Sequence, residues 1–253
     1  MATVSLKTLL EAGVHFGHPV KRWNPKMKPY IFTERNGIHI IDLQQTNERL
    51  RALTGWIEAL LERNETLLFV GTKKQAQEAI ETEARRCGMP YVNQRWAGGM
   101  LTNFRTVRSR LQRMHELEEM KEKGAFAEFS KKEAKRLDDE LTKLHRNLGG
   151  RRDMNRVPGA VFIVDTRKER IAMAETHRLD VPIVAIVDTN LDPDDVTFPI
   201  PGNDDGIRSV RLLTTLVADA VLEARGVHEA RHADVAAPPA VPETEAEPEP
   251  AAV

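Results

Sequence analysis

The chain has 253 residues, of which 41% are hydrophobic and 30% are charged, and its formal net charge is −1. Such a composition can bury a sizeable core, which suits one large folded domain. It excludes a membrane span, because no run approaches the roughly 18 apolar residues required, and the single Cys87 excludes an intrachain disulfide and a cysteine zinc cluster. The first residues carry no basic region followed by an apolar run, so we expect no secretory signal and a cytoplasmic protein.

Short apolar runs alternate with helical patterns along most of the chain. They predict helices at 44–63, 74–87, 169–178 and 207–225, and strands at 67–70, 160–164 and 183–187. The strand runs are apolar throughout, which is typical of parallel strands covered on both faces. Strands alternating with helices predict an α/β fold with a doubly wound, mainly parallel sheet.

The segment 103–148 interrupts this alternation, since it is highly charged and contains no strand-like run. Leucines at 137, 141, 144 and 148 follow a 4-3-4 spacing that predicts an apolar seam for a facing helix. Ser130 and Glu133 fit a capping box at the start of the second helix. We therefore predict an antiparallel helical hairpin inserted into the α/β body, standing away from its core as an interaction arm.

The C-terminal segment is rich in Ala, Pro, Val and Glu from about residue 233. Such a segment cannot bury enough apolar surface to offset its chain entropy. We predict a folded body at 1–228, which includes the 103–148 insertion, and a disordered acidic tail at 229–253.

Charge is distributed unevenly over the body. No acidic residue occurs between Glu83 and Glu116, and this stretch contains the arginines 85, 86, 95, 105, 108, 110 and 113. A second acid-free stretch, between Glu11 and Glu34, contains Lys21, Arg22, Lys26 and Lys28. Segregation of this kind indicates a polyanion-binding body, with solvated helix faces as the alternative.

Two segments combine bases with a tryptophan, namely 21–28 around Trp23 and 94–105 around Trp96. Arginine and lysine neutralise phosphates, and an exposed indole can stack on a base. These segments therefore predict RNA binding. The alternative is that both tryptophans are core anchors with incidental basic neighbours.

The signals for catalysis are weak. Gly71-Thr72-Lys73-Lys74 follows a strand but lacks the spacing of a phosphate loop. Asp165 and Asp188 follow other strands, where an enzyme of this fold class could place metal ligands. We predict no catalytic residue, and a nucleotide-dependent enzyme stays an alternative.

The histidines of His15-Phe16-Gly17-His18 stand three residues apart, which allows metal ligation with help from aspartates. The predicted ligand set is His18, Asp188 and Asp205, with Asp204 as a further candidate and zinc or magnesium as the ion. We expect no cofactor to be required, because histidine pairs are more often structural.

Several motifs in order along the chain resemble one known family. They are the segments 9–18, 22–27, 36–43, 69–76, 95–104, 158–165, 174–177, 186–190 and 199–205. Together they are similar to the S-two family of bacterial small-subunit ribosomal proteins, from about Ser5 to Leu222.

The resemblance implies a flavodoxin-like α/β domain with a coiled-coil hairpin. It implies a ribosomal protein that bridges head and body of the small subunit through ribosomal RNA, contacts other small-subunit proteins, and helps dock the S-one protein for messenger RNA capture. It implies no membrane and no small-molecule substrate, although a purely protein-binding scaffold acting through the hairpin stays an alternative. The RNA contacts carried over are Lys21, Arg22, Trp23, Asn24, Lys26, Lys73, Lys74, Arg95, Trp96, Asn103, Arg105 and Arg108.

Overall fold

A five-stranded parallel sheet forms the centre of the computed structural model, which describes residues 4–236 and their side chains through residue 227. Its strand order is β5-β4-β6-β7-β8. The strands are β4 (Leu67–Val70), β5 (Tyr91–Val92), β6 (Ala160–Val164), β7 (Ile183–Val187) and β8 (Phe198–Pro201). Counted from β4, this is the 2-1-3-4-5 order of flavodoxin-like folds. The three predicted strands and the predicted fold class are confirmed.

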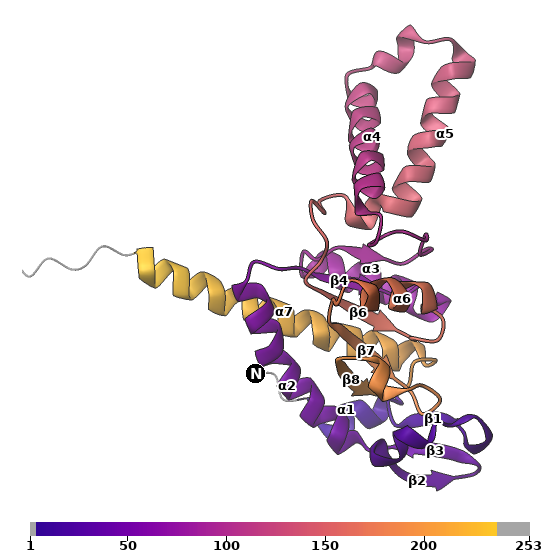
Figure 1. Cartoon of the computed structure of the whole chain (residues 1–253), viewed down its shortest axis with the longest axis vertical. Helices are drawn as coiled ribbons and strands as arrows, with labels where there is room; N and C mark the ends of the chain where they lie inside the picture. Colours follow the sequence, from indigo (N-terminus) through magenta and orange to yellow (C-terminus); the bar gives the residue numbers. More distant parts are fainter. Residues whose placement is uncertain (1–3, 237–253) are drawn as a thin grey trace, which may run out of the picture.

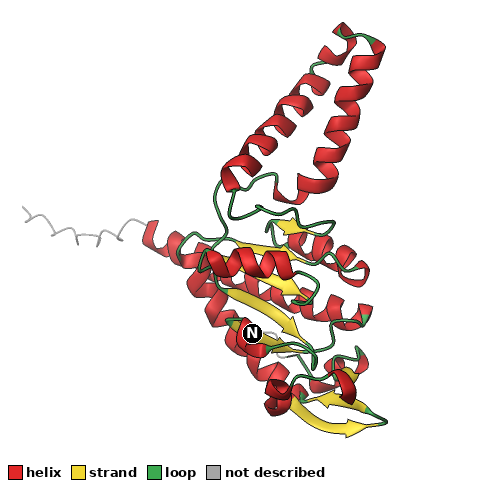
Figure 2. Ribbon diagram, turned by 45° about the vertical axis from the view of Figure 1, so that its right-hand side comes forward, coloured by secondary structure: helices red, strands yellow, loops and turns green. Residues whose placement is uncertain are grey.

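Helices cover both faces of this sheet (Figure 2). One face packs against α2 (Leu43–Glu62), α3 (Lys74–Arg86) and α7 (Ile207–Ala236). The other face packs against α6 (Arg170–Arg178) and the loop 96–101. Successive residues of β6 point to opposite faces, with Phe162 in the first core and Val161 in the second. This double burial explains why the strands are apolar at every position.

A small antiparallel sheet precedes the parallel one and was not predicted. It follows α1 (Leu6–Glu11) and has the order β1-β3-β2, with β1 (Phe16–Pro19), β2 (Ile31–Arg35) and β3 (Ile38–Ile41). The short 3-10 helices η1 (Val20–Arg22) and η2 (Pro25–Tyr30) connect β1 to β2. Asn36 and Gly37 join β2 to β3 with φ of 54° and 72°. An Asn-Gly pair between strand-like runs is a strong hairpin signal, so the sequence did contain the information.

The insertion projects from the body as two helices that lie side by side (Figure 1). They are α4 (Phe104–Glu122) and α5 (Lys131–Leu148), joined by η3 (Ala125–Glu128) and followed by η4 (Gly149–Arg151). Their shared apolar cluster consists of Leu111, Met114, Leu117, Leu141 and Leu148. The predicted capping box at Ser130 and Glu133 is present. Coiled-coil supercoiling of this pair stays a prediction.

The last helix is longer than predicted. Helix α7 continues to Ala236, past the predicted end of the body at 228, and 237–253 lie outside the described residues, so disorder of the acidic tail stays a prediction. The 3-10 helix η5 (Pro193–Asp195) lies between β7 and β8. Among the described helices, none combines the length and apolarity that a membrane crossing needs.

Candidate nucleic-acid interface

One buried carboxylate holds the loop that carries the second predicted basic segment. Oε1 of Glu175 accepts hydrogen bonds from Trp96 Nε1 (3.1 Å) and the Gly99 amide (2.7 Å). Its Oε2 accepts from the amides of Leu101 (2.9 Å) and Thr102 (3.2 Å) and from the Thr102 hydroxyl (3.2 Å). Helix α6 thereby fixes the course of residues 96–102 with a single side chain.

The charge of Glu175 is compatible with its burial because these donors surround it. Burial by itself would raise the pKa of Glu175, but the hydrogen bonds from Leu101, Trp96, Thr102 and Gly99 lower it overall. The carboxylate is therefore ionised at neutral pH. A charged acceptor forms stronger hydrogen bonds than a neutral one, which makes this anchor stiff.

Trp96 is a core residue, so its predicted role as a stacking face is wrong. Its side chain is only 6% exposed, and its ring belongs to the apolar cluster between the sheet and α6. The residues around it are the ones that face solvent, namely Arg95, Asn103, Arg105 and Arg108. None of these three arginines forms an ion pair with a residue whose side chain the structure describes.

Other arginines of the acid-free stretch are neutralised by the fold. Arg85 pairs with Glu81 at 2.7 Å, and Arg86 pairs with Glu83 and Asp219, each at 2.6 Å. Arg113 approaches Glu116 and Glu140. A run without acids in the sequence is thus only partly a basic surface, because acids at its borders and acids from other helices pair with its arginines.

The first basic segment lies beside β1 and supplies fewer free charges than its sequence suggested. Lys21 and Arg22 are exposed. Trp23 is half-buried with its ring 5.0 Å from that of His39. The half-buried Asn24 caps η2 by accepting from the Lys26 amide.

Lys26 pairs with Asp192 (2.8 Å) and Asp194 (2.9 Å), and these hydrogen bonds raise its pKa well above the usual range. Two of the predicted bases in this segment, Lys21 and Arg22, therefore remain available to a phosphate.

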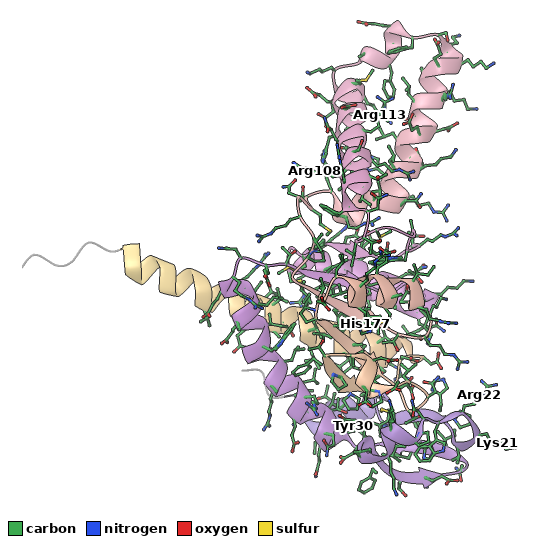
Figure 3. All side chains as sticks on the ribbon, viewed as in Figure 1. Lys21, Arg22, Tyr30, Arg108, Arg113 and His177 are labelled. Carbon is green, nitrogen blue, oxygen red and sulfur yellow. The ribbon has the colours of Figure 1, made fainter. Side chains whose placement is uncertain are left out.

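The two groups of free bases lie far apart. Figure 3 shows Lys21 and Arg22 at one end of the molecule and Arg108 on α4 toward the other. A ligand that contacts both groups must span the body of the protein, or two separate ligand segments must bind.

Lys73 does not belong to either group. Its ammonium lies 3.2 Å from Asp165 Oδ2, 3.0 Å from Asp204 Oδ1 and 2.6 Å from Asp205 Oδ1, and its side chain is 12% exposed. Burial alone would lower the pKa of Lys73, but these carboxylates raise it above the usual range. The predicted phosphate contact at Lys73 is therefore wrong, because its ammonium is engaged in ion pairs within the protein. The neighbouring Lys74 is exposed.

These aspartates gather at the carboxyl edge of the parallel sheet, where nucleotides bind in folds with this topology. The loop after β4 is also held by a carboxylate, since Oε1 of Glu169 accepts from the Thr72 amide (2.8 Å) and the Thr72 hydroxyl (2.5 Å). Burial raises the pKa of Glu169. Burial, with the charges of Asp188 and Asp165, raises the pKa of Asp204 to about 7. A phosphate chain would meet acidic groups here, which argues against the nucleotide-dependent alternative.

His18 lies beside the same cluster because β1 approaches the loop after β7. A Cβ at Gly17 would stand 2.6 Å from Thr189 Cγ2, so only glycine permits this approach. His18 Nδ1 lies 3.1 Å from Asp188 Oδ1, and Nε2 lies 3.3 Å from Asp205 Oδ2. The adjacent carboxylate of Asp188 raises the pKa of His18.

One nitrogen and two carboxylate oxygens in this cluster are arranged closely enough to share an ion. Ligand atoms of His18, Asp188 and Asp204 lie within 4.8 Å of one another. Asp205 faces the opposite ring nitrogen of His18, so the geometry favours Asp204 over the predicted Asp205 as the third ligand. Imidazole with carboxylates suits zinc better than magnesium.

Sequence reasoning missed Glu175 and Glu169, the two carboxylates that hold the loops. Their signal was weak, because Glu175 is one acid in a helix that also carries exposed charges, and Glu169 is a single acid just before that helix. An acid on the apolar side of α6, flanked by Ala172, Met173 and Thr176, would have marked Glu175.

A comparison with known protein families agrees with these observations. The family model described as Ribosomal protein S2 matches residues 9–224, which is well over half of the chain. Membership implies association with ribosomal RNA and with other ribosomal proteins. The chain belongs to the ribosomal protein S2 family, and it is a structural protein of the small ribosomal subunit rather than an enzyme.

Proposed function

We propose that this protein binds small-subunit ribosomal RNA in the cytoplasm and bridges head and body of the subunit by neutralising phosphates at two separate surfaces. The first surface comprises Arg95, Asn103, Arg105 and Arg108, and the second comprises Lys21 and Arg22. The observation that carries the proposal is the Glu175 anchor, which fixes the loop between Arg95 and Arg105. Both arginines are exposed and form no ion pair with the side chains that the structure describes.

The Glu175 anchor favours RNA binding because it reduces the conformational entropy that the loop loses on binding. A flexible loop loses conformational entropy when it binds, whereas residues 96–102 are already ordered by five hydrogen bonds to one carboxylate. Arginine suits phosphate recognition since its guanidinium stays charged and donates in a planar fork. Two surfaces that lie far apart suit a protein that joins two RNA segments (Figure 3).

The test measures affinity for small-subunit ribosomal RNA over a series of salt concentrations. Replacing both Arg95→Ala and Arg105→Ala should weaken binding and lower the slope of log affinity against log salt by roughly 0.7 for each lost phosphate contact. The matched control replaces the ion-paired Arg86→Ala and Arg113→Ala, which should leave that slope unchanged. An affinity of the unmodified protein that does not depend on salt would contradict the proposal.

We also propose that the S-one protein docks on this chain and that the outer part of α4 and α5 faces a protein partner. Support comes from the family and from the projection of this pair away from the body (Figure 1). Deleting residues 106–147 removes Arg108 but keeps Arg95, Arg105, Lys21 and Arg22, so most of both proposed RNA surfaces remain while the projecting part of the helix pair is lost. If the deletion variant still binds RNA but no longer captures S-one, both RNA binding by the two surfaces and docking through the helix pair are supported. If it loses all RNA affinity, the RNA contacts were assigned to the wrong surfaces.

A divalent ion at His18, Asp188 and Asp204 is a further proposal, supported by the distances between their ligand atoms. A bound zinc would fix β1 against the loop after β7. Lys73 already balances the charge of Asp204 and Asp205, so we expect folding not to require the ion.

A further inference from the structure

Helix α6 exposes a basic stripe that the sequence did not assign to any role. Residues 170, 171, 174, 177 and 178 are exposed, while 172, 173, 175 and 176 are buried. Arg170, Ala174 and Arg178 are spaced by four, so they lie along one side of the helix. Arg167 and Lys168, just before the helix, are exposed as well. Figure 3 marks this helix by His177.

The positive charge of this stripe is not compensated nearby. None of the bases at 167, 168, 170 and 178 forms an ion pair with any residue whose side chain is described. The acids of the same segment are engaged inside the fold, with Glu175 on the 96–102 loop, Glu169 on Thr72 and Asp165 on Lys73. Asp180, after the helix, is the exposed acid of this segment.

A groove of about 580 Å³ runs beside the stripe. It is lined by Thr102 from the anchored loop and by Arg170, Ile171, Ala174, Glu175 and Arg178 from α6. Ile171 is 57% exposed, so the groove offers apolar surface beside its two arginines. The carboxylate of Glu175 adds little repulsion, because it is surrounded by the donors that it holds.

We propose that this groove binds one strand of ribosomal RNA, with Arg170 and Arg178 on different phosphates and a ribose or base over Ile171 and Ala174. Eight residues of helix separate the two arginines by about 12 Å along the axis, more than a single phosphate spans. The groove also adjoins, through Thr102, the loop between Arg95 and Arg105, so it extends the first surface of the proposed function, on which it rests. A charged polymer with regular spacing fits these features better than an acidic peptide does.

The test compares two double variants of the full chain in binding to small subunits that lack this protein. Arg170→Gln with Arg178→Gln should reduce affinity at least tenfold and lower the salt slope by about 1.4, the value for two single-strand phosphate contacts. The control is Arg51→Gln with Arg211→Gln, two exposed arginines on α2 and α7, which cover the opposite face of the sheet. The control should bind within twofold of the unmodified protein, and both variants should keep its melting temperature.

The outcomes separate the two proposals. If the unmodified protein shows no salt-dependent binding, the proposed function fails. If it binds with a normal salt slope and the α6 variant matches the control, only the groove assignment is overturned.

A tethered cleavage reagent locates the occupant directly. Cys87 is fully buried, and burial raises the pKa of its thiol to about 11, so a cysteine introduced by Ala174→Cys would be labelled selectively. An iron chelate attached there should cut ribosomal RNA at one or a few adjacent positions. Cleavage of a neighbouring protein without cleavage of RNA would assign the groove to a protein partner and overturn the inference.

Discussion

The indole Nε1 of Trp96 donates a hydrogen bond of 3.1 Å to a carboxylate oxygen of Glu175, across 79 positions of sequence. This contact joins the loop after β5 to helix α6, and the amides of Gly99, Leu101 and Thr102 converge on the same carboxylate. A buried acid is thus the structural basis of a surface that carries exposed arginines.

Replacing Glu175 should destabilise the folded protein. Glu175→Ala leaves several donors without an acceptor, so we expect a loss of about 3–5 kcal/mol in the free energy of unfolding, measured by urea denaturation. RNA affinity should fall too, because the loop is no longer ordered. Glu48→Ala, an exposed acid on α2, serves as the control and should change stability by less than about 0.5 kcal/mol. Equal stabilities of the two variants would refute the anchor.

The same anchor predicts a pH dependence. The pKa of Glu175 is lower in the folded protein than its ordinary value of 4.5, so the unfolded chain binds more protons between the two values. Its contribution to stability is present above pH 4.5 and is lost as pH falls through the folded pKa. The difference in unfolding free energy between the unmodified protein and Glu175→Ala should therefore shrink below pH 4.5. A difference that stays constant down to pH 3 would show that the charge of Glu175 does not matter.

Replacement of the adjacent residues Lys73 and Lys74 should have different effects on stability. Lys73→Ala removes the partner of three carboxylates and should cost about 3 kcal/mol of stability. Lys74→Ala should leave stability unchanged, because Lys74 is exposed and forms no ion pair with the described side chains. Urea denaturation of both variants distinguishes the roles. If Lys73→Ala were as stable as Lys74→Ala, the carboxylate cluster would not depend on this ammonium.

Zinc should stabilise the protein through His18. Ligand binding to the folded state raises the melting temperature, so added zinc should raise it and His18→Ala should abolish the increase. His15→Ala is the matched control, since His15 is not among the three grouped ligands. An identical increase in both variants would place the zinc elsewhere.

Local pattern was enough to predict the three central strands of the parallel sheet, because β4, β6 and β7 are buried on both faces and their apolar runs are unbroken. The helix pair of the insertion could be anticipated from leucine spacing and from the Ser130 cap. Strand β8 was harder to predict, since Phe198-Pro199-Ile200-Pro201 contains two prolines, which a strand tolerates only at a sheet edge.

The candidate RNA interface was predicted less well from the sequence. Acidic residues distant in sequence decide which basic side chains remain without an ion pair. In the sequence, Lys73 has the position of a phosphate-binding lysine after a strand. In the fold, it forms ion pairs with Asp204 and Asp205 instead. In the sequence, Trp96 stands among arginines like a residue that stacks on RNA bases. In the fold, it is buried beside α6. The α6 stripe was overlooked for the opposite reason, since its acids turn inward and leave its bases uncompensated.

In the proposed function, phosphate contacts hold this protein in the small subunit. Sedimentation of a cell lysate through sucrose at low and at high salt, with detection of this chain in each fraction, tests this attachment. We predict that the protein travels with small subunits at low salt and is released at high salt, and that Arg95→Ala with Arg105→Ala shifts release to lower salt. A protein that remains at the top of the gradient at low salt, or one whose retention is indifferent to salt, would contradict the claim.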